Sequence, residues 1–183
     1  NWEGQGIESE LTRAGIPSYI ESNRNIFEDK SVVDFLNYLK TVSRTELSRM
    51  AFAPGVVDEE IIHALFSAFS GIPAIDVYKL ADLHASTRPR ASLFSIMTDR
   101  LRLEQGGISS IESICKFAES LADCAATVRQ KNAPQAFEAV ARESGFLNYI
   151  VSLNSRKAIL KFNALFNELK SSVQSKADYT LSD

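Results

Sequence analysis

The feature that most constrains the fold is a helical spacing of apolar side chains from about residue 31 to about residue 175. The first such stripe recurs at intervals of three and four residues, which places its members on one face of an α-helix: Val32, Phe35, Leu36, Leu39 and Val42. The chain has only 8 glycines and 5 prolines in 183 residues, so few positions interrupt its helices. Residues 30–175 therefore predict a mainly α fold, a bundle of roughly seven to nine helices.

Turn residues divide this region into its expected helices. We expect helices over residues 31–42, 44–52, 58–69, 75–85, 90–104, 109–128 and 134–144, a short turn or helix over 146–153, and a last helix ending near Val173. Ser31 with Asp34, and Ser109 with Glu112, have the spacing of capping boxes. Asp58 is expected to cap the third helix.

The first 29 residues have a different pattern. Residues 6–14, GIESELTRA, have the character of the end of a helix, and Gly15 stands where a C-terminal capping glycine would. Pro17 prevents helix from continuing, and Tyr19 with Ile20 favours a short strand. A helix followed by a strand is typical of an α/β layer. We therefore predict an α/β edge fragment over residues 1–29, an all-helical region over 30–175 and a polar tail over 176–183.

Bulk properties narrow the class of protein further. A net charge of -3 argues against a uniformly basic nucleic-acid binder, although local basic patches remain compatible with it. The chain has no apolar run of about 18 residues and no signal peptide, so we expect no membrane association. It does not begin with Met, and we expect a piece of a longer or processed chain. Cys115 and Cys124 fall on one predicted helix, roughly 13 Å apart along its axis, too far to pair. Two free thiols fit the cytoplasm.

Motifs for catalysis or cofactor binding are missing from the sequence. It has no phosphate-binding glycine loop and no serine or cysteine in a nucleophile-elbow context. His63 and His84 have no second ligand three or four residues away, so we expect no metal site from them. The acidic run of residues 58–60 suits the positive end of a helix dipole. We therefore predict no catalytic, cofactor-binding or metal-binding residue in this chain.

One basic concentration could contact nucleic acid. It holds four arginines with few acids between them: Arg88, Arg90, Arg100 and Arg102. Arginine binds phosphate through a fork of donors, so these residues could give a modest, salt-dependent DNA contact. Arg24, with Lys30 and Lys40, forms a second basic group. In both groups the alternative is an ordinary solvated helix face, which we regard as the simpler interpretation.

Two segments resemble a known family. The stretch Ala14–Pro17, followed by the block IFEDKSVVDFLNYLK over residues 26–40, resembles the segment after motif IV in superfamily 1 DNA helicases of the UvrD, Rep and PcrA type. The agreement needs no gap and includes seven positions: Phe27, Glu28, Val32, Asp34, Leu36, Tyr38 and Leu39. ESGFLNYI, residues 143–150, is similar to a segment near the end of that family's helical insertion.

This resemblance implies that the chain is one part of a larger protein. The block would lead from the second RecA-like motor domain (2A) into its helical insertion subdomain (2B). Residues at the joint would be Gly15, Pro17, Phe27, Glu28 and Asp34. The parent would be an ATP-dependent 3′-to-5′ DNA helicase acting in DNA repair, which binds ATP and magnesium outside these residues. The insertion would contact or gate duplex DNA.

One departure from the family weakens the expected DNA contact. The family has a Pro-x-Arg-Gly hairpin near Gly55 that touches phosphate, whereas this chain lacks the arginine and places three acids directly afterwards. A second function therefore stays open: the chain could be a stand-alone all-α module that binds a partner protein. The least favoured function is that of an enzyme in its own right. We expect the chain to be monomeric or to self-associate weakly.

Overall fold

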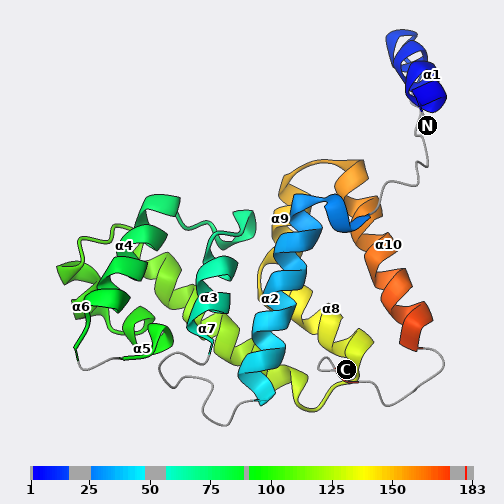
Figure 1. Cartoon of the computed structure of the whole chain (residues 1–183). Helices are drawn as coiled ribbons and strands as arrows, with labels where there is room; N and C mark the ends of the chain where they lie inside the picture. The colour runs from blue at the N-terminus through cyan, green and yellow to red at the C-terminus, as the bar shows by residue number, and fades with distance from the viewer. Residues whose placement is uncertain (1, 17–25, 48–56, 89–90, 174–179, 181–183) are drawn as a thin grey trace.

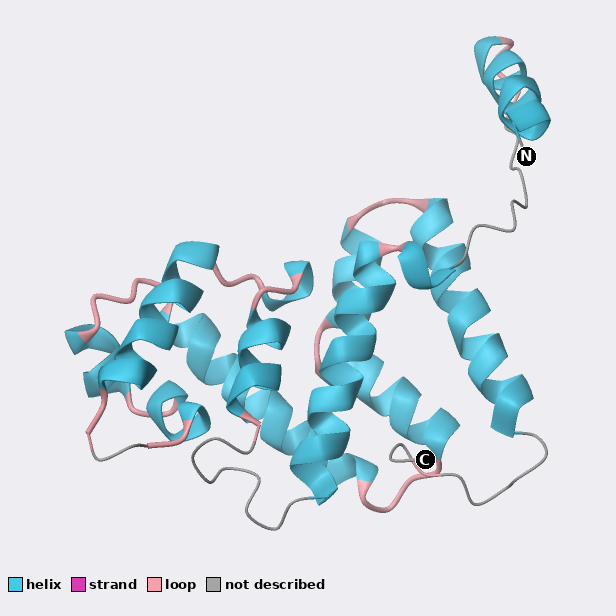
Figure 2. Ribbon diagram, in the orientation of Figure 1, coloured by secondary structure: helices cyan, strands magenta, loops and turns pink. Residues whose placement is uncertain are grey.

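The computed structural model describes residues 2–16, 26–47, 57–88, 91–173 and 180. Within these ranges the regular structure is entirely helical, which confirms the mainly α fold class (Figure 2). The α-helices are α1 (Trp2–Arg13), α2 (Lys30–Leu47), α3 (Asp58–Leu65), α4 (Ala74–Ser86), α5 (Leu93–Met97), α6 (Arg100–Gln105), α7 (Ile111–Val128), α8 (Ala133–Glu143), α9 (Phe146–Ser152) and α10 (Arg156–Val173). Two 3-10 helices are η1 (Ile26–Glu28) and η2 (Ala68–Ser70).

Helix α7 is the element that the rest of the bundle shares. It packs against α5 and α6 near its start and against α2 and α8 further along (Figure 1). We call α3–α6 the aliphatic end of the bundle and α2 with α8–α10 the aromatic end. Helix α1 stands apart from both (Figure 1).

The aromatic end is built around a cluster of phenylalanine rings. Phe35 is fully buried, stacks on Phe146 with ring centroids 4.2 Å apart, and meets Phe137 edge-on at 5.2 Å. Phe137 in turn stacks on Phe162 and Phe166 of α10. Each ring buries a large apolar surface and also contributes pair geometry, so these contacts bring α2, α8, α9 and α10 together.

The aliphatic end has a core of another kind. Over helices α3–α6, as far as the structure describes them, the buried apolar side chains are aliphatic or Met: Ile61, Ala64, Leu65, Val77, Leu80, Leu93, Ile96, Met97 and Leu103. Two buried carboxylates join its helices. Asp58 accepts a hydrogen bond of 2.9 Å from the backbone N–H of Leu93, at the start of α5. Asp76 accepts from the N–H groups of Ser109 and Ser110, at 3.2 and 2.8 Å, and so caps α7 from α4.

The protonation of Asp76 follows from this role. Burial alone would raise the pKa of Asp76, but hydrogen bonds from Ser110 and Ser109 and the charge of Lys79 outweigh burial and hold its pKa below the ordinary value. The carboxylate therefore stays ionised while it holds the N–H groups of Ser109 and Ser110, the two residues directly before α7. A helix start needs such acceptors because its first N–H groups have no partner within the helix.

Several predicted helix starts were wrong in their capping residues. Helix α2 begins at Lys30, and Asp29 accepts the N–H of Ser31 at 3.0 Å, so Asp29 rather than Ser31 is the cap. Asp34 instead accepts from Lys30 Nζ at 2.7 Å and from the Ala68 N–H at 3.4 Å. The Asp34 carboxylate is thus bound by a side chain of its own helix and by the N–H beside η2, and it does not complete a capping box with Ser31.

The other two predicted caps fail for a related reason. Asp58 is the first residue of α3, and its carboxylate points to α5 instead of capping its own helix. The start of α7 is capped from another helix by Asp76, and Glu112 pairs with Arg100 rather than completing a capping box with Ser109. In both cases a contact between distant segments of the chain replaces the predicted local cap.

Two predicted helix boundaries also need correction. Helix α2 continues unbroken through residues 44–47, so the separate helix expected over 44–52 does not begin at 44. The helix expected over 90–104 is two helices, α5 and α6, because Asp99 caps α6 by accepting the Arg102 N–H at 3.2 Å. Gly15 has φ +71° and ends α1 as predicted. The predicted strand at Tyr19 and Ile20 lies outside the described residues.

Candidate nucleic-acid interface

The predicted arginine group lies at the surface of the aliphatic end, where α4 ends and α6 begins. Arg88 follows α4, and its guanidinium donates to the carbonyls of Ala85 and Thr87 at 2.9 and 3.0 Å. These carbonyls belong to the last turn of the helix, whose acceptors have no partner within it. These hydrogen bonds hold Arg88 against the end of α4. Both acceptors are neutral carbonyls, so the positive charge of Arg88 remains available to a phosphate.

Arg100 and Arg102 are each paired with an acid. The two terminal nitrogens of Arg100 contact both carboxylate oxygens of Glu112 on α7, the second contact at 3.0 Å. The hydrogen bond between them raises the pKa of Arg100 and lowers the pKa of Glu112, with their mutual attraction adding to both effects. Arg102 Nε lies 3.0 Å from Asp99 Oδ2. A phosphate would meet two nearly neutral pairs here, which weakens the expected attraction.

The remaining predicted site residues divide by location. Arg24, Gly55, Arg90 and Pro17 lie outside the described residues. The joint residues Phe27 and Glu28 form η1, and Phe27 is 49% exposed.

The start of α2 is fastened to the last helix of the chain. Asp29, next to η1, pairs with Lys161 of α10. Partial burial would raise the pKa of Asp29, but the hydrogen bond and charge of Lys161 outweigh it and lower that pKa. The carboxylate is thereby kept ionised where it also caps α2.

Four further cations were not singled out by the sequence reasoning. Arg129 and Lys131 lie on the turn between α7 and α8, and Arg156 and Lys157 open α10; Lys131 is partly exposed and the other three are exposed. None of them pairs with an acid in the described part of the chain. Their sequence signal is a lack of acids: none occurs over residues 124–137 or over 144–167. In Figure 1 the turn between α7 and α8 lies at the bottom of the view and the start of α10 at the top, so the two pairs do not form one patch.

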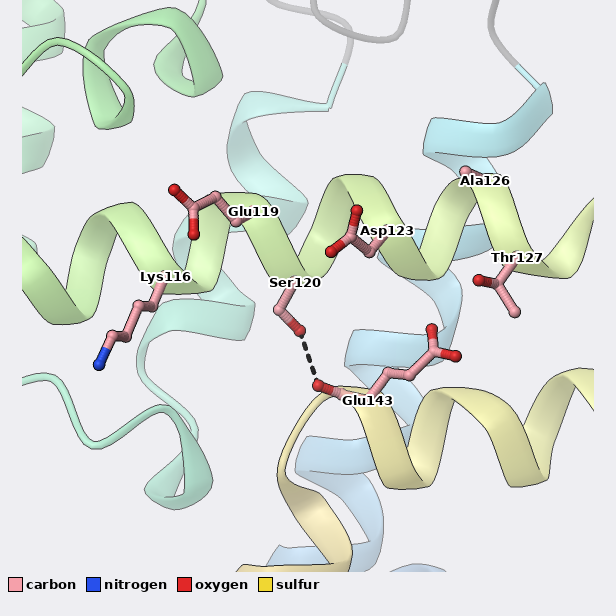
Figure 3. Close-up of a pocket in the computed structure, with 7 residues that line it drawn as sticks. All are labelled: Lys116, Glu119, Ser120, Asp123, Ala126, Thr127 and Glu143. Atoms are coloured by element: carbon pink, nitrogen blue, oxygen red, sulfur yellow. Dashed lines mark hydrogen bonds between the residues drawn. The ribbon is translucent and has the colours of Figure 1, made fainter.

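A surface hollow between α7 and α8 is the wrong place for phosphate. Figure 3 shows its lining, which carries three acids and one lysine: Lys116, Glu119, Ser120, Asp123, Ala126, Thr127 and Glu143. The Ser120 hydroxyl donates to the carbonyl oxygen of Glu143 at 3.1 Å (Figure 3). An excess of acids repels a polyanion.

Beneath this hollow lies a buried polar group that joins α2 to α7. The Tyr38 hydroxyl is 3.4 Å from Ser120 Oγ and 3.9 Å from Cys124 Sγ. Burial raises the pKa of Tyr38 and also raises the pKa of the Cys124 thiol, to about 11. Both groups are therefore protonated near neutral pH, which is typical of structural rather than reactive side chains.

The histidines and cysteines hold no cluster for chemistry in the residues described. His63 is exposed and lies 3.9 Å from Glu59, whereas His84 Nε2 lies 3.1 Å from Asp58 Oδ2 without an aligned hydrogen bond. Cys115 and Cys124 are free and buried on α7, as predicted. Over the described ranges, no three side chains of metal-binding type gather, and no helix is long and apolar enough to cross a membrane.

Comparison with known proteins gives a distant relative. The chain is 23% identical over 151 residues to an ATP-dependent helicase/nuclease subunit from Oceanobacillus iheyensis. The matched stretch covers 82% of this chain but only 11% of that protein. No protein-family profile matches the chain, and no solved structure matches it. The similarity supports a relationship between this chain and one part of a helicase/nuclease protein.

Proposed function

We propose that this chain is the helical insertion subdomain, with the edge of its motor domain, of an ATP-dependent 3′-to-5′ DNA helicase. The observation that carries the proposal is the similarity to a helicase/nuclease protein over 82% of the chain. The block over residues 26–40 supports it further, because its agreement with the helicase family falls where an α/β motor would lead into the insertion.

The geometry around this block suits a joint. Asp29 caps α2 and also pairs with Lys161 of α10, so the start of the bundle is fastened to its last helix. Asp34 fastens the same helix to Ala68, beside η2. Both contacts hold the first turns of α2 firmly against the bundle, which lets a movement of the preceding segment act on the helices as one unit.

The role of the insertion is to contact or gate duplex DNA while the parent unwinds it. Charge favours the cations without an acidic partner as phosphate contacts over Arg100 and Arg102, because the latter two are neutralised by neighbouring acids. Arg88 and the pair Arg129 and Lys131 are the ones tested below; Arg156 and Lys157 meet the same condition. ATP, magnesium and the motor motifs belong to the parent outside these residues.

The nucleotide chemistry gives the first test. The isolated chain, mixed with ATP, magnesium and single-stranded DNA, is expected to release no phosphate above a protein-free blank. Hydrolysis stimulated by single-stranded DNA would refute the assignment, because it would require a nucleotide site within these residues. The parent reading frame gives a second check: a phosphate loop and an Asp-Glu-x-Gln box upstream, with a Gln-x-x-Arg-Leu motif downstream, are expected.

DNA contact is tested by fluorescence anisotropy with a labelled forked duplex at several salt concentrations. Substituting Arg88, Arg129 and Lys131 with Ala should weaken binding and lower the slope of log K against log salt by about 1 for each lost phosphate contact. The matched control changes Arg100, Arg102 and Arg142 to Ala together, which removes the same number of positive charges from side chains that are each already paired with an acid. Equal loss in the control would mean that net charge alone, not a located interface, governs binding.

A further inference from the structure

An exposed apolar patch lies where α3 ends and α4 begins, away from the charges discussed above. It consists of Phe66, Ile75 and Tyr78, which are 37%, 63% and 65% exposed. The Phe66 and Tyr78 rings touch edge to face, with centroids 5.2 Å apart and planes at 63°. Ile75 lies one helical turn before Tyr78 and so shares its side of α4.

The packing of α3 against α4 and of both helices on the core supports the patch. At the far end of the same helix pair, His84 of α4 lies beside Asp58 of α3, so the two helices run antiparallel and contact at both ends. Directly beneath the patch, Leu65 and Val77 are fully buried in the core. Single exposed apolar residues are ordinary, but adjacent ones on a fixed support are typical of an interaction site.

The charges beside the patch are negative. Glu59 lies two turns before Phe66, with a side chain 87% exposed, and Asp82 is exposed one turn after Tyr78. Asp82 forms no ion pair within the described residues. Three basic side chains lie near these acids. His63 is 3.9 Å from Glu59, Lys40 lines the same hollow as Glu59, and the charge of Lys79 is balanced by Asp76, 3.7 Å away. Asp82 therefore leaves the clearest negative charge beside the patch.

This combination selects one kind of occupant. Exposed aromatic rings can stack on nucleic-acid bases, but such sites also need positive charge along the backbone of the strand. Here the flanking acids repel a polyanion and attract lysine and arginine. We propose that Phe66, Ile75 and Tyr78, flanked by Glu59 and Asp82, form a docking surface for a helical segment of a partner protein that presents apolar anchors beside basic side chains.

Binding of a model helix to the full 183-residue chain tests this. The probe is a fluorescein-labelled synthetic helix of about 18 residues, with Leu on one face and Lys beside it. Phe66→Ala combined with Tyr78→Ala should weaken binding about tenfold, as expected for aromatic anchors at the centre of an interface. Asp82→Asn should weaken it about threefold, and more at low salt than at high salt.

The control variant combines Leu101→Ala with Val151→Ala, which removes apolar surface of similar exposure, 70% and 68%, elsewhere on the chain. It should change binding by less than about twofold. A probe with Glu in place of Lys should bind about tenfold more weakly to the natural chain. Ile75→Lys adds a charge to the patch without removing the ring contact, and circular dichroism verifies that each variant is folded.

Four outcomes would overturn the proposal. One is equal binding of the probe to the patch and control variants, and another is indifference of binding to the sign of the probe's charge. A third is binding of oligothymidine that is lost in the Phe66→Ala, Tyr78→Ala variant, which would make the patch a nucleic-acid platform. The last is a dimer in light scattering that the same variant dissolves, which would assign the patch to a second copy. None of these results decides the helicase assignment, which rests on the similarity over 82% of the chain.

Discussion

The aromatic end and the aliphatic end of the bundle each hold several helices together, but they do so with different contacts. At the aromatic end, α2 is joined to α8 and α9 by stacked and edge-on rings, with Phe35 in contact with Phe137 and Phe146. At the aliphatic end, carboxylates reach from one helix to N–H groups at or just before the start of another. Helices α3, α5 and α6 have only 8, 5 and 6 residues, and short helices expose many unpaired backbone groups for each buried side chain, so this end depends more on such contacts. The aromatic end has polar contacts of Asp29 and Asp34 in addition to its rings.

This contrast has a consequence for how each end responds to mutation. Ring packing is spread over several neighbours, so its loss leaves a cavity whose cost depends on the removed volume. A carboxylate tie is local, and its loss leaves a named N–H group buried without an acceptor. The predictions below test this difference, beginning with the largest effect.

The largest effect is expected from the centre of the ring cluster. Phe35→Ala should lower the free energy of unfolding by about 3–5 kcal/mol, because Phe35 is fully buried and its ring meets rings on three other helices. Leu80→Ala is the matched change at the aliphatic end and should cost about 2–4 kcal/mol. Urea denaturation followed by circular dichroism measures both. A smaller loss for Phe35 than for Leu80 would contradict the special weight given to the rings.

The carboxylate tie should rank second. Asp58→Ala should cost about 1–3 kcal/mol, because it leaves the Leu93 N–H buried without its acceptor. Thr41→Val is the control at the aromatic end. The buried Thr41 hydroxyl donates to the Asn37 and Glu60 carbonyls, and its removal should cost less than about 1 kcal/mol because carbonyls tolerate the loss of one of their donors. Equal losses would remove the distinction between the two kinds of contact.

The third prediction concerns acid. The folded pKa of Asp76 lies below its unfolded value of about 3.9, so Asp76 contributes stability that is complete above about pH 5 and is lost as the pH falls through the folded pKa. Asp76→Asn should therefore lower stability at pH 7 and flatten its dependence on pH between about 5 and 2. Thermal melts across this range measure both. An unchanged acid profile would mean that Asp76 is not ionised in the folded protein.

The smallest effect is expected from an exposed ion pair. Arg100→Gln should leave the urea midpoint unchanged within error, since Arg100 and Glu112 are 57% and 66% exposed. Lys161→Met should lower the free energy of unfolding by about 1 kcal/mol, because Lys161 and Asp29 are only 25% and 26% exposed. The change also removes the ion pair that holds Asp29, the residue that caps α2. A larger effect of the Arg100 change would show that the α6–α7 pair matters more than its exposure implies.

How far the sequence predicts this fold depends on the range of the interaction. The number and rough positions of the helices follow from apolar spacing, and α4 and α7 lie close to their expected ranges. The caps do not follow, because Asp76 caps a helix that begins 35 residues later. Local spacing cannot reveal a partner that the fold brings together.

The candidate site shows the same limit more strongly. Arg100 stands out in the sequence as part of a basic group, yet the fold places Glu112 of α7 against it, whereas the partner of Arg102, Asp99, lies only three residues away in the sequence. Phe66 continues the apolar stripe of α3, but α3 ends at Leu65, so its ring turns outward to Tyr78 rather than into the core. Side-chain charge and apolar character are local properties, whereas availability to a partner is decided by tertiary contacts.

Helix α7 has a mechanical consequence. Its 18 residues span about 27 Å without a break, and both ends of the bundle are attached to it. Helices α5 and α6 contact α7 near its start and α8 contacts it further along, so α7 connects the two ends of the bundle directly. Helix α4, which carries Tyr78, reaches α7 through Asp76 and the N–H groups directly before α7, so a displacement of α4 would act first on the start of α7.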